Sequence, residues 1–150
     1  YYTSDSTKTP FLQGNRTFGM KYPSFDTYTS KVTKLAPSGS VIISVRAPVG
    51  DTNLAPIDLC LGRGVAALVS NDSDNEFLYY LMMYMVPVLN QNENGSTFGS
   101  INKTDICHLP IMLPDVYSRF RIGKFLSSID NEIRILQKIN DNLGGAVVAS

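Results

Sequence analysis

The side chains best suited to chemistry in this sequence are those that can bind a polyanion, and they gather early in the chain. Residues 1–50 hold six lysines and arginines against two aspartates, whereas residues 51–100 hold one arginine against six acidic residues. Lysine and arginine bind phosphates, while amide and hydroxyl groups read base edges. This clustering, rather than the net charge of zero, predicts a nucleic-acid contact in the first third. An ordinary solvated surface is the alternative.

Candidate DNA-contacting residues are polar or basic side chains in two segments. The basic first third contributes Gln13, Asn15, Arg16, Lys21, Tyr22, Lys31 and Lys34. The surroundings of the glycine-rich stretch at 95–99 contribute Asn94, Ser96, Thr97 and Lys103. Arg46 and Arg63 lie in strand and turn patterns, so we interpret them as structural. For each candidate, an exposed loop residue without a ligand is the alternative.

Residues that could perform catalysis are sparse. His108 is the only histidine, and its apolar neighbours are typical of a structural histidine rather than a general base. The segment 95–99 has threonine where a nucleophile elbow needs serine, and neither glycine-rich nucleotide-binding motif occurs. Asp115 and Glu132 match a nuclease pattern only faintly. We therefore expect no catalytic activity and no metal site, with a small nuclease as a distant alternative.

The elements that must position these residues read as strands first and helices later. β-Branched or apolar runs predict strands at 40–46, 57–61 and 64–69, with a bend at Gly62 to Gly64, and residues 9–30 read as short strands and loops. Cap-type residues at 71–74 predict a buried helix from Glu76, whose methionines and tyrosines are core filler. A polar loop at 90–100 and an extended stretch at 101–113 follow. The order indicates an α+β fold around a twisted mixed β-sheet.

The last segment predicts one long helix with the apolar seam of a coiled coil. It has no proline between Val116 and Leu143. Its apolar residues, with Asn140 in one of the positions, recur at alternating spacings of four and three. The seam consists of Ile122, Leu126, Ile129, Ile133, Leu136, Asn140 and Leu143. Asn140 falls at an a position, where a buried amide fixes register. Gly144 and Gly145 are expected to end the helix; a surface helix packed on its own domain is the alternative.

The predicted organisation is a domain over 1–114, a helix over 115–143 and a tail over 144–150. Because the chain begins at Tyr1 rather than methionine, we expect the N-terminal edge of the domain to be missing. Cys60 and Cys107 form no paired motif, which favours a reducing compartment. The longest apolar stretch, 77–89, is short for a membrane span. Together these features predict a cytoplasmic protein.

Four blocks of sequence resemble one known family. They are Ala36-Pro-Ser-Gly-Ser-Val-Ile-Ile-Ser-Val-Arg-Ala-Pro-Val-Gly-Asp51, Leu61-Gly-Arg-Gly-Val-Ala-Ala-Leu68, Gly95-Ser-Thr-Phe-Gly-Ser-Ile-Asn-Lys-Thr-Asp-Ile106 and Leu109-Pro-Ile-Met-Leu-Pro114. Their order resembles the target-recognition domain of type I restriction-modification specificity subunits. The helix at 121–134 is similar to the spacer helix that follows that domain.

The resemblance implies a non-catalytic subunit that chooses the DNA sequence for others. Such a subunit binds double-stranded DNA, docks a methyltransferase subunit through its helix, and pairs that helix with a second copy or half of the specificity subunit. S-Adenosylmethionine and ATP would be bound by partner chains, so no cofactor is expected here. A full-length subunit has two recognition domains, whereas this chain has one. The rival reading is an assembly module that docks partners without binding DNA.

Overall fold

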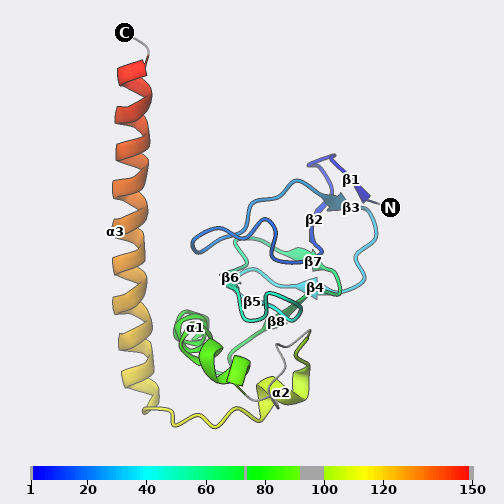
Figure 1. The fold of residues 1–150 in the computed structure, drawn as a ribbon, viewed down its shortest axis with the longest axis vertical. Coiled ribbons are helices and arrows are strands. Elements are labelled where there is room, and N and C mark those ends of the chain that lie inside the picture. The colour runs from blue at the N-terminus through cyan, green and yellow to red at the C-terminus, as the bar shows by residue number, and fades with distance from the viewer. Residues whose placement is uncertain (1, 73, 92–99, 149–150) are drawn as a thin grey trace.

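The chain folds into a β-rich domain joined to a long helix, as seen in the computed structural model, which describes residues 2–72, 74–91 and 100–148. Figure 1 shows the long helix standing beside the domain and extending well beyond it. The strands of the described part are β1 (Tyr2–Thr3), β2 (Thr9–Leu12), β3 (Tyr28–Thr29), β4 (Leu35–Ala36), β5 (Val41–Ser44), β6 (Thr52–Leu54), β7 (Leu59–Leu61) and β8 (Val65–Leu68). The helices are α1 (Asn75–Gln91), α2 (Lys103–Cys107) and α3 (Val116–Val148).

The strands form two sheets rather than one. A five-stranded sheet has the order β1-β3-β2-β7-β4, and a three-stranded sheet has the order β6-β5-β8. Only β2 and β7 pair in parallel among the described strands, with Phe11 opposite Cys60, and the other pairs are antiparallel. The predicted fold class, mixed β structure followed by a long helix, is confirmed.

The core sits on both sides of β5, whose four residues are all buried. Val41 and Ile43 point into a cluster shared with α1, and Ile42 points into a cluster between the two sheets. This alternation follows from the two-residue period of a strand. The sequence predicted the strand at 40–46 because such a β-branched run suits burial on both faces. β5 therefore lies in the middle of three layers, with the five-stranded sheet on one side and α1 on the other.

Helix α1, which the sequence predicted as a helix from Glu76, covers the three-stranded sheet. The side-chain oxygen Oδ1 of Asp74 accepts a hydrogen bond from the Phe77 N–H at 3.0 Å, which caps the first turn. Tyr79, Met82 and Met85 are buried against the sheet. Tyr79, Met82 and Met85 are thus core residues, as the sequence interpretation held, whereas Met83 and Tyr84 are exposed and depart from it.

Two boundaries differ from the predictions. Residues Lys103–Cys107 form α2 instead of extended chain, because Asn102 and Asp105 make reciprocal capping hydrogen bonds. α3 passes through Gly144 and Gly145 and ends at Val148, so the prediction that these glycines terminate it is wrong. Glycine weakens a helix by about 1 kcal/mol per residue but permits helical torsions. Among the described residues, no helix has the length and apolarity that crossing a membrane requires.

Candidate nucleic-acid interface

A basic groove brings together three predicted DNA-contacting residues that are far apart in sequence. Gln13, Lys34 and Lys103 line a cavity of about 1000 Å³ between the five-stranded sheet, β8 and α2. Arg63 lines it too, so three cations face the groove, and none of the lining residues that the structure describes is acidic. A groove lined by one sign of charge concentrates the opposite charge. This surface therefore suits a polyanion.

The turn between β7 and β8 places Arg63 beside Gln13. The N–H of Gly64 donates to the Gln13 carbonyl at 2.9 Å, and the N–H of Gly62 donates to the Leu12 carbonyl at 2.7 Å. A Cβ at Gly62 would lie 2.9 Å from the Gln13 Cα, closer than real contacts allow. The two glycines are needed because the turn packs directly on the end of β2, and Arg63 between them is exposed at the groove. From its sequence context we interpreted Arg63 as structural and did not anticipate that it lines the groove.

The floor of the groove is apolar and its rim is polar. Phe11, Leu61 and residues 65–68 of β8 supply the floor, while Asn102 and Cys107 lie at the rim on α2. Cys107 is exposed and Cys60, the second cysteine, is buried. Asn102 was missed by the sequence analysis, although its capping pattern with Asp105 was visible. A mixed lining of this kind can contact both phosphates and the apolar parts of nucleotides.

Several other candidates lie away from the groove. Asn15 donates to the Asp51 carboxylate at 2.6 Å. Arg16 pairs with Asp26 at 2.6 Å, with both side chains largely exposed; this contact, more than that with Thr27, holds the pKa of Asp26 below its usual value. An exposed pair of this type contributes little stability and can be rearranged by a ligand.

Two further candidates, Tyr22 and Lys31, lie neither in the groove nor beside this ion pair, and three others lie outside the described residues. Tyr22 lies under the guanidinium of Arg134, 5.7 Å from its ring centre. Lys31 is exposed and is not among the groove's lining residues. The candidates of the glycine-rich stretch lie outside the described residues; they are Asn94, Ser96 and Thr97.

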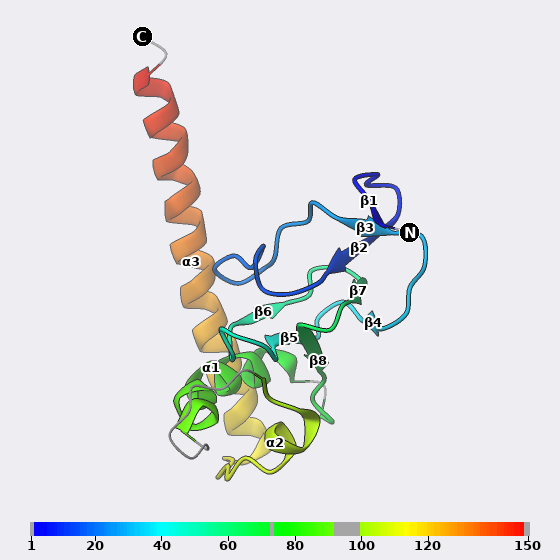
Figure 2. The same cartoon turned by 45° about the vertical axis from the view of Figure 1, so that its right-hand side comes forward.

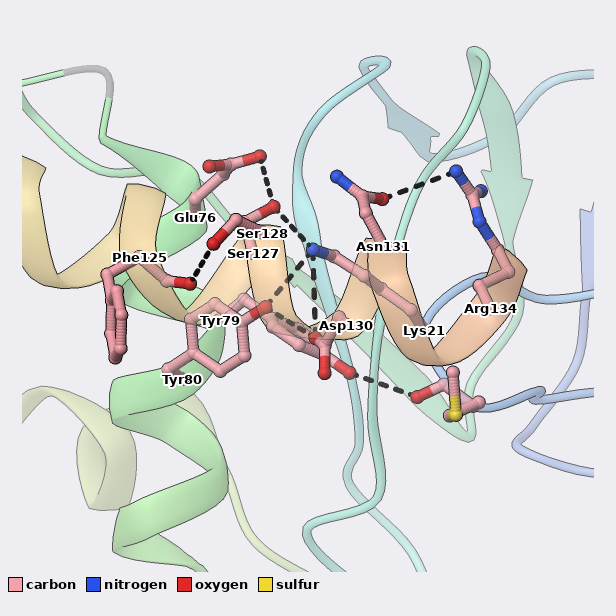
Figure 3. A network of polar contacts seen from close by, with 11 residues as sticks. Lys21, Glu76, Tyr79, Tyr80, Phe125, Ser127, Ser128, Asp130, Asn131 and Arg134 are labelled. Carbon is pink, nitrogen blue, oxygen red and sulfur yellow. Dashed lines mark hydrogen bonds and ion pairs between the residues drawn. The ribbon is translucent and has the colours of Figure 1, made fainter. Parts of the chain in front are cut away.

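Lys21 is buried, which conflicts with the prediction that it contacts DNA. Its side chain is 4% exposed, and its ammonium group points at α3 rather than at solvent (Figure 3). The ammonium donates to Ser127 Oγ at 2.8 Å and to the Tyr80 hydroxyl at 3.2 Å, and it lies 3.8 Å from Asp130 Oδ2. A phosphate cannot reach a cation enclosed in this way. Sequence reasoning failed here because the partners lie 59 to 109 residues along the chain.

We call this second polar cluster the helix seat; it comprises Lys21, Tyr80, Gly123, Ser127 and Asp130. Tyr80 donates its hydroxyl hydrogen to Asp130, and Ser127 donates to Glu76 at 2.9 Å (Figure 3). Burial, together with the hydrogen bond to Asp130, raises the pKa of Tyr80, so the phenol stays a donor. Burial similarly raises the pKa of Tyr79 to about 12. The seat is therefore a satisfied network around one buried ammonium.

Gly123 brings α3 against the first turn of α1. A Cβ at this position would lie 2.8 Å from the Phe77 backbone nitrogen, so the two helices touch backbone to backbone. One turn earlier, Arg119 forms an ion pair with Asp72 at 2.7 Å. The first turns of α3 are thus attached to the domain through small and polar residues.

The predicted seam of α3 faces solvent in this single chain. Leu126 is half-buried, whereas Ile129, Ile133 and Leu136 are 41%, 40% and 62% exposed. The remaining seam positions, Ile122, Asn140 and Leu143, are exposed as well. The alternative, a surface helix packed on its own domain, holds for the first turns of α3, but there the contacts are made by Gly123 and Ser127 and not by the exposed seam positions. Figure 2 shows the upper turns of α3 without any neighbouring element.

The two residues of the faint nuclease pattern lie in different places. Asp115 caps α3 by accepting hydrogen bonds from the Ser118 N–H at 3.0 Å and the Ser118 hydroxyl at 2.6 Å, and the hydroxyl contact lowers the pKa of Asp115. Glu132 is 17 residues further along the same helix, or about 25 Å at the α-helical rise. The two carboxylates therefore cannot share a metal or a scissile phosphate.

Comparison with known proteins defines the class to which this fold and groove belong. The family model for the type I restriction modification DNA specificity domain matches residues 3–144. A Methanocaldococcus jannaschii protein assigned as the MjaX specificity subunit of a type I restriction enzyme is 39% identical over 144 residues, covering 95% of this chain and 34% of that protein. The chain belongs to the type I restriction modification DNA specificity domain family. It spans about a third of the length of this relative.

Solved structures agree with this assignment. The HsdS subunit from Thermoanaerobacter tengcongensis superposes with a TM-score of 0.74 at 35% identity, covering 92% of this chain and 34% of that one. A chain from a structure describing complex assembly and conformational transition of the type I R-M system gives 0.77 at 37% identity, with 92% and 35% covered. The predicted family is confirmed, and it is that of the specificity subunit rather than a catalytic one.

Proposed function

We propose that this domain recognises duplex DNA through the basic groove and thereby directs a partner methyltransferase or restriction complex to its target. The observation that carries the proposal is the groove itself, which Lys34, Arg63 and Lys103 line and which has no acidic lining residue within the described part of the chain. Gln13 places an amide donor and acceptor among these cations, and Asn102, whose Oδ1 caps α2, adds its amide nitrogen as a donor. Such groups suit base-edge or sugar contacts. The family of the chain supports the same conclusion.

The remaining sequence candidates extend the proposed surface. Arg16, Asn15 and Lys31 are outside the groove, and they are proposed as peripheral phosphate or sugar contacts. Asn94, Ser96 and Thr97 are retained as proposed contacts because Lys103, which follows them in sequence, lines the groove. Lys21 is removed from the set because it is buried.

The exposed seam supports the proposal that α3 pairs with another helix. Isolated apolar side chains are common on surfaces, but a continuous stripe marks an interaction site. The proposed occupant is a second spacer helix, from another copy or another half of the subunit, with Asn140 fixing the register. The methyltransferase subunit would dock on the same assembled helices. S-Adenosylmethionine and ATP would then be bound by partner chains.

Salt-dependent binding tests the groove. Changing Lys34→Ala and Lys103→Ala together should weaken binding to a random-sequence duplex. It should also reduce the slope of log K against log salt by about two units, because a complex that has lost two phosphate contacts releases fewer counterions when it forms. A control with Lys8→Ala and Lys138→Ala, two exposed lysines outside the groove, should keep the wild-type slope. An unchanged slope in the groove variant would place the phosphate contacts elsewhere on the domain, whereas no binding by the wild type would favour the assembly module.

The reactivity of the Cys107 thiol, which lines the groove, provides a second test. Cys107 is exposed at the rim while Cys60 is buried, so a thiol reagent should modify Cys107 first. Bound duplex should slow this modification in the wild type and have no effect in the double lysine variant. Equal rates with and without duplex would place the DNA elsewhere on the domain.

A further inference from the structure

α3 is attached to the domain around a buried ammonium, although the same helix has an apolar face that could have made the contact. This is an unusual arrangement. The seat instead uses Lys21, which is 4% exposed, with Ser127 at 5% exposure and Gly123 against backbone. Burying a charge costs free energy unless all its partners are in place. An apolar contact tolerates sliding, whereas this network is satisfied in one arrangement.

The contacts of the seat extend over successive turns of α3. Gly123, Ser127 and Asp130 lie on one side of the helix, and each meets a different part of the domain: the start of α1, the Lys21 ammonium and the Tyr80 hydroxyl. Moving α3 along its axis or rotating it would separate Lys21 from Ser127 and Asp130 together. The seat therefore fixes both translation and rotation of the helix.

The seat is connected rigidly to the recognition surface. The loop carrying Lys21 is held by the Leu54 N–H, which donates to the Lys21 carbonyl at 2.8 Å, and by Asn53, which hydrogen-bonds both backbone groups of Gly19. Leu54 belongs to β6, at one edge of the three-stranded sheet, and β8 at the other edge forms part of the groove floor. A single sheet thus links the seat to the groove.

The length of α3 amplifies any error at the seat. From Asp130 to Val148 the helix rises about 27 Å, so a tilt of roughly 10° at the seat displaces its end by about 5 Å. One base-pair step of DNA is about 3.4 Å. A small tilt at the seat therefore displaces the end of α3 by more than the rise of one base pair, which is the difference in length between two DNA targets whose spacers differ by one base pair.

We propose that the helix seat sets the orientation of α3 relative to the recognition groove, so that Lys21, Gly123 and Ser127 determine the separation of the DNA half-sites that an assembled complex accepts. This rests on the proposed function in one respect, namely that the groove reads DNA. These are positioning residues, since none of them touches the nucleic acid. Asp130 and Tyr80 serve the same role by completing the coordination of the ammonium.

The orientation itself is tested without DNA. Spin labels at Cys107 and at Lys138→Cys, which lie on the groove rim and on an exposed turn of α3, report the distance between domain and helix by double electron–electron resonance. The wild type should give one narrow distance population. Lys21→Met should broaden or shift it by about 5 Å, the displacement expected from a modest tilt, whereas the control Lys8→Met should not. An unchanged distribution in Lys21→Met overturns the proposal.

A milder variant keeps the test decisive if Lys21→Met does not fold. Ser127→Ala removes one partner of the ammonium and should broaden the same distance distribution, while Ser128→Ala on the exposed side should leave it unchanged. Identical distributions for these two folded variants would overturn the proposal.

The link to DNA is tested with the complex of the chain and its methyltransferase partner on a library of bipartite sites with varied spacers. Sequencing of methylated DNA should give one spacer length for the wild type and several for Lys21→Met. Broadened distances with an unchanged spacer length would show that the seat does not determine half-site separation, which overturns the proposal. A wild-type complex that marks no bipartite site would refute the proposed function and the spacing claim, while the distance measurements would still report on the seat.

Discussion

The two faces of α3 reverse the usual arrangement of a surface helix. The face that touches its own domain consists of Gly123, Ser127 and Asp130, whereas the face turned to solvent carries Ile129 and Ile133. An amphipathic helix ordinarily buries its apolar face on its own domain. At 100° per residue the two faces are roughly a third of a turn apart. The helix thus attaches to its domain by specific polar contacts and leaves its hydrophobic surface available for another chain.

Gly123→Ala should have the largest effect of three substitutions that compare these faces. Alanine favours a helix, but its Cβ would meet the Phe77 backbone at 2.8 Å, and overpacking of this kind costs about 1–3 kcal/mol. Urea unfolding should therefore show a lower free energy of unfolding. Gly14→Ala is the control, since a Cβ there has no atom within 4 Å. Equal stability of the two variants would mean that the close approach of α1 and α3 contributes nothing.

Ser127→Ala should have a smaller effect on the same face. It removes the hydroxyl that accepts from Lys21 at 2.8 Å and donates to Glu76 at 2.9 Å, and loss of a hydrogen bond to a buried charge costs about 1–2 kcal/mol. Ser128→Ala, on the exposed side of the helix, should change the free energy of unfolding by only a few tenths of a kcal/mol. A smaller loss at Ser127 than at Ser128 would contradict the seat as described.

Ile133→Asp should have the smallest effect on the chain alone, because Ile133 is 40% exposed and belongs to neither core cluster. We expect a change within about 0.5 kcal/mol in unfolding. Sedimentation equilibrium should nevertheless show weaker pairing of helices, while Asn140→Ile should strengthen pairing and admit other registers. If wild type and both variants are monomers with and without DNA, the proposed helix pairing is wrong.

Local patterns in the sequence predicted most of the elements. The β-branched run at 40–46 predicted β5, the cap residues before Glu76 predicted α1, and the heptad spacing predicted α3. These predictions succeeded because strand and helix periods and capping depend on residues a few positions apart. The capping pair Asn102 and Asp105 carried the same kind of signal for α2, but the neighbouring prolines directed the interpretation towards extended chain.

The candidate site was only partly predictable for the opposite reason. Composition selected lysines and amides in the first third, and the fold placed Gln13 and Lys34 in the groove. The same composition could not separate Lys34 from Lys21, because the burial of Lys21 depends on Ser127, 106 residues away. Arg63 joined the groove because two glycines allow its turn to pack on β2.

The sequence by itself determined the family, most of the elements and the existence of an apolar seam, since each of these depends on residues close together in the chain and on their spacing. Only the tertiary structure decided which cations face a ligand and which are enclosed, and which side of α3 meets the domain. The physical reason is that charge and hydrophobicity are properties of single residues, whereas burial of an ammonium or a glycine contact requires partners from distant segments. Lys21 and Lys34 lie 13 positions apart and have the same chemistry. They differ only in that the tertiary structure buries Lys21 and leaves Lys34 exposed.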